Sequence, residues 1–138
     1  MPEAFDNCIN QIDQAMIVHL QWRSRLNNVF KTGEAAISVE EASNDCLCDF
    51  GKWLTGQDIS DVFRSTERYI AVHRLHYDFH KSAAVVLDLA LKRDNADKAV
   101  LRTAIREYNQ ASNKLLRELL DWKEAEVEVI AELKSAMQ

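Results

Sequence analysis

Apolar side chains recur along most of this chain at alternating spacings of three and four residues. That period is typical of an amphipathic α-helix with one buried face. It predicts long helices over about residues 4–31, 59–92 and 96–137. Each of these stretches is long enough to form one side of a helical bundle.

The same spacing predicts which residues of the long helices face the core. The expected stripes are Phe5, Ile9, Ile12, Met16, His19, Arg23, Leu26 and Phe30; then Ile59, Val62, Phe63, Ile70, His73, Tyr77, His80, Ala84, Leu87 and Leu91; then Leu101, Ile105, Tyr108, Leu115, Leu119, Trp122, Val129 and Leu133.

Turn and capping residues mark where these helices begin and end. Thr32-Gly33 closes the first helix, since glycine favours a C-terminal cap. The turn before the last helix lies at residues 93–95, where Asp94 or Asn95 is the expected N-cap.

A shorter helix is predicted between the first two long ones, and the sequence offers two starts for it. Ser38-Val-Glu-Glu41 has the form of a capping box, and Ser43-Asn-Asp45 is the alternative. Thr55-Gly56 ends it under either reading. The chemistry-bearing and apolar residues on this segment are Cys46, Cys48, Phe50, Trp53 and Leu54.

These elements predict an all-α protein with one domain over residues 1–138. Three glycines and one proline are too few for many strands and tight hairpins. We therefore expect an antiparallel four-helix bundle whose short second helix carries the cysteines.

The charge balance excludes several classes of partner. A net charge of −5 disfavours nucleic acid and anionic membrane surfaces, which both attract basic proteins. No apolar run approaches the ~20 residues of a membrane span, and the N-terminus lacks a signal-peptide pattern. We expect a cytoplasmic protein whose three cysteines are thiols or metal ligands and form no disulfide framework.

Three of the four histidines lie within eight residues, at His73, His76 and His80. His76 and His80 are four residues apart, so they share a helix face and are spaced to grip one metal ion. A single histidine on such a stripe is usually a hydrogen-bonded core residue. Three on one helix are costly to bury without a shared partner, which favours a metal or an active site.

The remaining histidine and a cysteine complete a tetrahedral donor set. His19 lies in the middle of the first helix's stripe, and Cys48 lies on the short helix. One thiolate and three imidazoles suit zinc. Four protein ligands leave no position for an activating water, so the site is expected to bind or sense and not to catalyse.

Three motifs carry a family resemblance: His19-Leu-Gln-Trp22, Cys48-Asp-Phe-Gly-Lys-Trp53 and His76-Tyr-Asp-Phe-His80. In this order and spacing the sequence resembles the chemoreceptor zinc-binding (CZB) domain family over nearly its whole length. The resemblance implies zinc ligation by His19, Cys48, His76 and His80.

The resemblance also implies a homodimeric helical bundle that modulates a bacterial chemoreceptor or a diguanylate cyclase. No cyclase motif or methyl-accepting coiled coil follows the last predicted helix. The expectation is either an excised sensor domain or a version that acts on a partner in trans.

Several neighbours of the four ligands receive separate interpretations. His73 is expected to support a metal ligand or to pack against a neighbouring helix. Cys46 is not expected to bind the metal together with Cys48, because residues two apart on a helix point to different sides unless the helix starts after them. Gly51 suits a close approach by a neighbouring helix, and Lys52 adds positive charge if it faces the sulfur. Phe50 and Trp53 are expected to wall the metal from water.

Three other functions compete with zinc sensing. A redox sensor would use oxidation of the Cys48 thiolate by hypochlorous acid or peroxide, with Cys46 as a resolving thiol. A di-iron bundle needs more histidine and carboxylate ligands, and no glutamate lies three residues before a histidine. A plain structural bundle would hold no metal.

Overall fold

The computed structural model describes residues 2–137, with side chains described from Asn7 onward. The expected burial of Phe5 lies outside the described side chains. All regular structure in the described range is helical, which confirms the all-α prediction. The helices are α1 (Pro2–Thr32), α2 (Val39–Ser43), α3 (Asp49–Thr55), α4 (Asp61–Arg64), α5 (Glu67–Leu91) and α6 (Lys98–Ala136).

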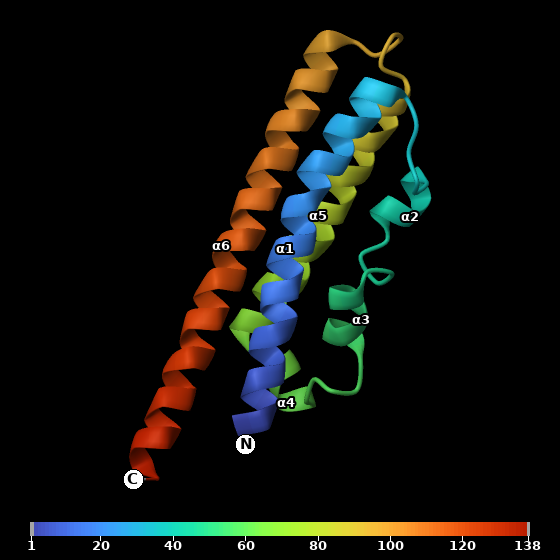
Figure 1. Ribbon diagram of the computed structural model, residues 1–138. Coiled ribbons are helices and arrows are strands. Elements are labelled where there is room, and N and C mark those ends of the chain that lie inside the picture. Colours follow the sequence, from blue (N-terminus) through green and yellow to red (C-terminus); the bar gives the residue numbers. More distant parts are fainter. Residues whose placement is uncertain (1, 138) are drawn as a thin grey trace.

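Three long helices form the body of the protein. In Figure 1, α1 and α5 run in the same direction, and α6 returns in the opposite direction beside them. The packing is closest between α5 and α6, and α1 contacts both. The α2–α3 segment descends along the outside, with α2 against α5 and α3 against α1.

The predicted single short helix is in fact two, separated by an irregular loop. Ser38 caps α2 by accepting the N–H of Glu41, so the first of the two predicted starts is correct. The alternative start at residues 43–45 begins no helix. Instead, α3 begins after Cys48, whose sulfur accepts the N–H of Gly51. Cys46 and Cys48 therefore precede α3, which corrects their predicted helical placement.

The helix predicted from residue 59 is also interrupted. A single turn, α4, precedes α5, and the Thr66 hydroxyl caps α5 by accepting the N–H of Tyr69. A capping side chain satisfies a backbone donor that a continuous helix would bond internally, so it favours a new helix start here.

The buried stripe predicted for residues 59–92 is confirmed at Ile59, His80, Ala84 and Leu87, but it is wrong at several other positions. Val62, Ile70 and Tyr77 are 80%, 56% and 45% exposed. The face that packs is lined by Tyr69, Val72, His76, Phe79, His80, Ala83, Ala84, Val86, Leu87 and Ala90. Val72, His76 and Phe79 lie on this face, whereas the predicted stripe ran through Ile70, His73 and Tyr77. The observed face packs against α1, α2 and α6.

Smaller corrections apply to α1 and α6. Trp22 is buried in place of the predicted Arg23. Asp97 caps α6 through the N–H groups of Ala99 and Val100, so neither predicted cap is correct. The predicted α6 stripe is buried from Tyr108 to Trp122. Leu101 and Ile105 before it are partly buried, and Val129 and Leu133 beyond it are exposed.

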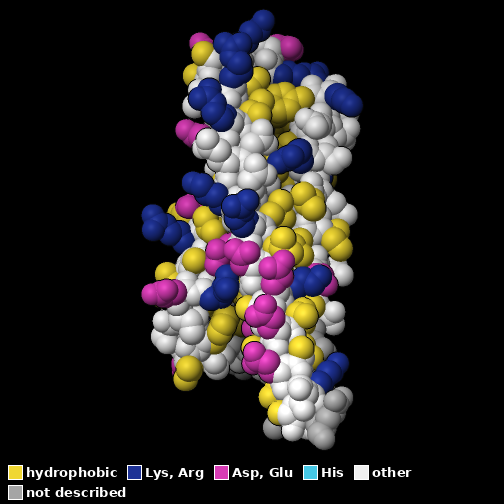
Figure 2. Space-filling view, turned by 90° about the vertical axis from the view of Figure 1, so that its left-hand side faces the viewer, with side chains coloured by type: hydrophobic (Ala, Val, Ile, Leu, Met, Phe, Trp, Pro, Cys, Tyr) yellow, Lys and Arg dark blue, Asp and Glu magenta, His cyan; other side chains and the backbone are white. Residues whose placement is uncertain are grey.

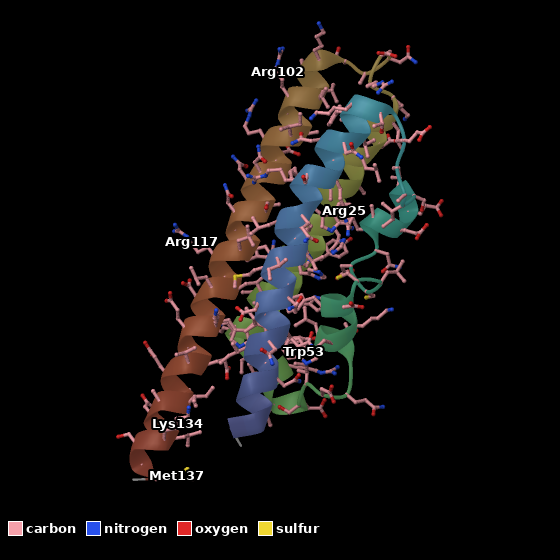
Figure 3. All side chains as sticks on the ribbon, viewed as in Figure 1. Arg25, Trp53, Arg102, Arg117, Lys134 and Met137 are labelled. Atoms are coloured by element: carbon pink, nitrogen blue, oxygen red, sulfur yellow. The ribbon has the colours of Figure 1, made fainter. Side chains whose placement is uncertain are left out.

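The surface of α6 is divided by charge. Figure 2 shows basic side chains gathered towards one end of this face and acidic side chains towards the other. Arg102 and Arg117 point away from the bundle in Figure 3. Within residues 2–137, no helix combines the length and apolar character that a membrane crossing requires.

Candidate metal centre

Four side chains from three separate segments converge in the interior. They are His19 of α1, Cys48 before α3, and His76 and His80 one turn apart on α5. Their donor atoms all lie within 4.8 Å of one another. The three histidines are buried, each 1–2% exposed. The structure thus brings together all four residues that the sequence singled out.

The ring nitrogens of the histidines point at one another. His76 Nε2 lies 3.1 Å from His19 Nε2 and 3.1 Å from His80 Nε2. Cys48 Sγ lies 3.3 Å from His76 Nε2. Zinc–nitrogen and zinc–sulfur bonds of about 2.0–2.3 Å give a tetrahedron with edges of about 3.3–3.6 Å. The three distances are close to those edges.

Hydrogen bonds on the far side of two rings decide which nitrogen carries the proton. His19 Nδ1 faces the Ala15 carbonyl at 2.5 Å, and His80 Nδ1 faces the Ala42 carbonyl at 2.9 Å. A carbonyl oxygen only accepts, so each Nδ1 donates its hydrogen. A neutral ring has one such hydrogen, which leaves Nε2 with a lone pair directed into the cluster.

Burial keeps these rings uncharged. It lowers the pKa of His19 to about 4 and, together with His19 and His80 nearby, the pKa of His76 to about 2. Burial also lowers the pKa of His80. Neutral imidazole is the form that binds metals. The lone pairs of His19 and His80 converge with His76 Nε2 and the Cys48 sulfur, and such a donor set suits a shared metal ion.

The Cys48 sulfur is subject to opposing influences at the start of α3. Its sulfur accepts the Gly51 N–H at the start of α3. Burial raises the pKa of the Cys48 thiol, while the N–H groups of Gly51 and Phe50 act in the opposite direction. Lys52 is exposed, and the structure shows no contact between it and the sulfur. The backbone donors, with a bound cation, are therefore what favours the charged sulfur.

Gly51 is required by the chain's own loop. A Cβ at this position would lie 1.7 Å from the Asp45 carbonyl oxygen. The close approach that the sequence suggested is therefore real, but the neighbour is the preceding loop and not another helix. This contact holds the Asp45–Cys48 turn against α3.

Aromatic rings enclose the cluster. Phe50 lies 5.2 Å from the His76 ring, and Phe79 lies 4.9 Å from the His19 ring, both edge to face. Trp22 lies 6.0 Å from His80. Trp53 takes no direct part in this wall, because it stacks on Trp122 at 5.6 Å and lies behind Phe50.

His73 and Cys46 lie outside the cluster. His73 is partly exposed and lies 5.8 Å from the Tyr69 ring, which agrees with a packing role. Cys46 is exposed, with its sulfur 3.9 Å from the Asp45 carboxylate. Both cysteines precede α3, so the argument that residues two apart on a helix point to different sides does not apply to them. Cys46 is separated from the site because its side chain is exposed at the surface.

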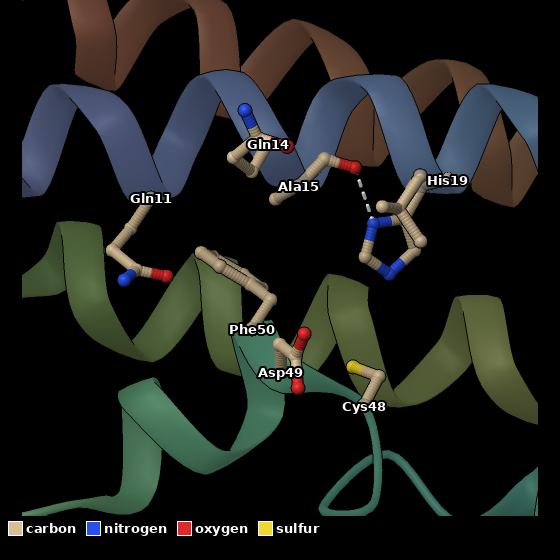
Figure 4. A pocket seen from close by; sticks show the side chains of 8 residues that line it. Gln11, Gln14, Ala15, His19, Cys48, Asp49 and Phe50 are labelled. Carbon is tan, nitrogen blue, oxygen red and sulfur yellow. Dashed lines mark hydrogen bonds between the residues drawn. The ribbon is translucent and has the colours of Figure 1, made fainter.

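Two clefts lead from the surface towards Cys48. One of 330 Å³ lies between α1 and α3, with Gln11, Gln14 and Asp49 in its lining (Figure 4). The other, of 240 Å³, is bordered by α1 and α2 and also reaches His80. Cys48 borders both clefts and is the ligand with most access to solvent.

Sequence reasoning missed the groups that orient the ligands. The carbonyls of Ala15 and Ala42 belong to the backbone, so no residue type signals them. In the sequence, Asp45 stands out only as part of the candidate helix start at residues 43–45. Its Oδ2 lies 4.0 Å from His76 Nδ1, and an acidic residue three positions before the cysteine is the signal that was available.

Comparison with protein-family models matches residues 19–87 to the chemoreceptor zinc-binding domain. The match covers half of the chain and extends from His19 past His80. Comparison with curated proteins and with solved structures gave no match.

Proposed function

Because the chain belongs to the chemoreceptor zinc-binding domain family, we propose that it is a zinc-binding sensory module that regulates a signalling output. The ligands in this proposal are His19, Cys48, His76 and His80. The observation that carries it is the convergence of three uncharged Nε2 atoms and one sulfur in a buried site. These four donors would fill the coordination shell of a zinc ion and leave no position for an activating water, so the proposed role is regulatory and not catalytic.

The chain's own residues explain how occupancy is reported. His76 and His80 lie on a continuous 25-residue helix, whereas Cys48 lies on a loop before a seven-residue helix. Ligation by all four ties this loop to α1 and α5. The geometry of the α2–α3 segment is then the signal passed to an output of the chemoreceptor or diguanylate cyclase type, in cis or in trans. The free cysteines suit a cytoplasmic location.

A comparison of two histidines on one helix tests this ligand set. Protein purified without added metal is expected to contain about one zinc per chain by elemental analysis. His76→Ala removes a ligand and leaves converging lone pairs unpaired, so zinc content falls below about a tenth. His73→Ala, three residues away, keeps full zinc. The reverse order for the two variants would refute the assignment.

The two clefts at Cys48 favour a second function, oxidant sensing at the same site. The Cys48 thiolate would attack the O–O bond of hydrogen peroxide, giving a sulfenic acid and releasing hydroxide. A sulfenic acid is a poorer ligand, so the tie to α3 is lost. Cys8 provides an internal comparison. Burial raises the pKa of both thiols, to about 12 for Cys8, but Cys8 lies outside the metal donor set, so no bound cation would favour its thiolate.

Peroxide treatment of the zinc-loaded protein tests this second function. Zinc release, followed with a coloured indicator, is expected in step with oxidation of Cys48 in peptide mass spectra. Cys46→Ser is expected to release zinc as well, but to accumulate sulfenic acid if Cys46 resolves it. Oxidation of Cys46 or Cys8 while zinc stays bound would contradict oxidant sensing through Cys48.

We also propose that a second copy of the chain pairs along α6. This helix has 39 residues, and its C-terminal end extends past the rest of the bundle in Figure 1. It leaves several apolar side chains exposed: Leu120, Val127, Val129, Leu133 and Met137. Its first half carries exposed basic residues and its second half acidic ones, so two antiparallel copies would match in charge.

Light scattering at tens of micromolar tests the pairing. The mass is expected to be twice that of the chain, and Val127→Glu is expected to lower it because a charge enters the apolar contact. Arg102→Glu is also expected to lower the mass, since it places an acidic side chain opposite the acidic half of α6 in the second copy. A monomeric mass for the unmodified protein would rule the pairing out.

A further inference from the structure

The three imidazoles differ in what their outer nitrogen contacts. Nδ1 of His19 and Nδ1 of His80 each face a backbone carbonyl, at 2.5 Å and 2.9 Å. Nδ1 of His76 instead faces a carboxylate, with Asp45 Oδ2 at 4.0 Å. His76 is also the ring whose Nε2 lies close to the donor atoms of all three other ligands. The orientation of the His76 ring therefore matters most for the geometry of the donor set, and the charged side chain of Asp45 faces this ring.

The backbone of Asp45 is fixed at this position. Its carbonyl packs so closely on α3 that a Cβ on Gly51 would lie 1.7 Å away. Cys48 Sγ lies 3.7 Å from the same carbonyl. The Asp45 side chain is 14% exposed and so is partly shielded from water. One residue thus touches α3 through its main chain and faces α5 through its side chain.

The Asp45 carboxylate also lies near the net charge that an occupied site would carry. A divalent cation with one thiolate and three neutral imidazoles leaves one net positive charge. A buried charge is costly unless an opposite charge lies near it. Asp45 provides a negative charge on the outer side of the His76 ring, at ion-pair distance.

We propose that Asp45 is a positioning residue of the zinc centre, accepting the Nδ1–H of His76 and balancing the charge of the occupied site. The proposal rests on the zinc site described under the proposed function. A carboxylate behind a ligating histidine fixes the ring and raises its basicity. Loss of such a partner costs about 10–100-fold in metal affinity.

Zinc affinity, measured by competition with a coloured chelator, tests the proposal. Measurements are made where circular dichroism shows every zinc-free variant to be folded. Asp45→Ala is expected to bind about 10–100-fold more weakly. Asp45→Asn is expected to fall between it and the wild type, because an amide oxygen accepts a hydrogen bond but carries no charge. Asp49→Asn removes an exposed carboxylate next to Cys48 and is expected to change affinity less than about fivefold.

Nitrogen-15 NMR of the zinc-loaded protein separates positioning from general stability. Asp45→Ala is expected to shift the His76 ring signals most, with a smaller shift at His80, on which the Asp45 charge also acts, while those of His19 stay in place. Equal affinity for Asp45→Ala and wild type, or an equal loss for Asp49→Asn, would overturn the proposal. Asp45→Asn binding as tightly as wild type would overturn its charge-balancing part. Failure of the wild type to bind zinc would instead refute the proposed function itself.

Discussion

The fold depends on one constraint, which is that three neutral imidazoles and a thiol share a buried point. The His19 and His80 rings are each held with the lone pair inward by a carbonyl behind them, and aromatic rings shield the cluster. Such a group of donors is poorly satisfied without a cation, and a cation bound only by the folded state stabilises that state. The metal centre is therefore part of the core of the bundle.

This constraint acts most strongly on the α2–α3 segment. Helices of five and seven residues are too short to be stable alone, so they depend on their contacts and caps. Three links hold the segment: the Ala42 carbonyl on His80, Cys48 in the cluster and Asp45 facing His76. In contrast, α1, α5 and α6 pack along their lengths. Loss of the metal is expected to free the segment first, because mobile elements are those with the fewest contacts.

The sequence predicted the long helices and the converging donors, because both follow from regular spacing. His76 and His80 share a helix face wherever that helix begins. The predicted stripe was spaced as one helix from residue 59, whereas α5 starts at Glu67 after its own cap, so Val72 and His76 are buried where Ile70 and Tyr77 were expected. The Ala42 carbonyl behind His80 is a tertiary contact, which local spacing does not encode. The Cys48 N-cap and the Ala15 carbonyl behind His19 are local contacts, but a cysteine cap and a backbone carbonyl have no distinct residue signal.

Hydrogen exchange on zinc-loaded and zinc-free protein tests most directly whether the metal holds the α2–α3 segment in place. Faster exchange after zinc removal is expected to concentrate between about Val39 and Gln57, while the central turns of α5 and α6 keep their protection. Unchanged protection between Val39 and Gln57, with the loss appearing instead in α5 around His76, would contradict the account.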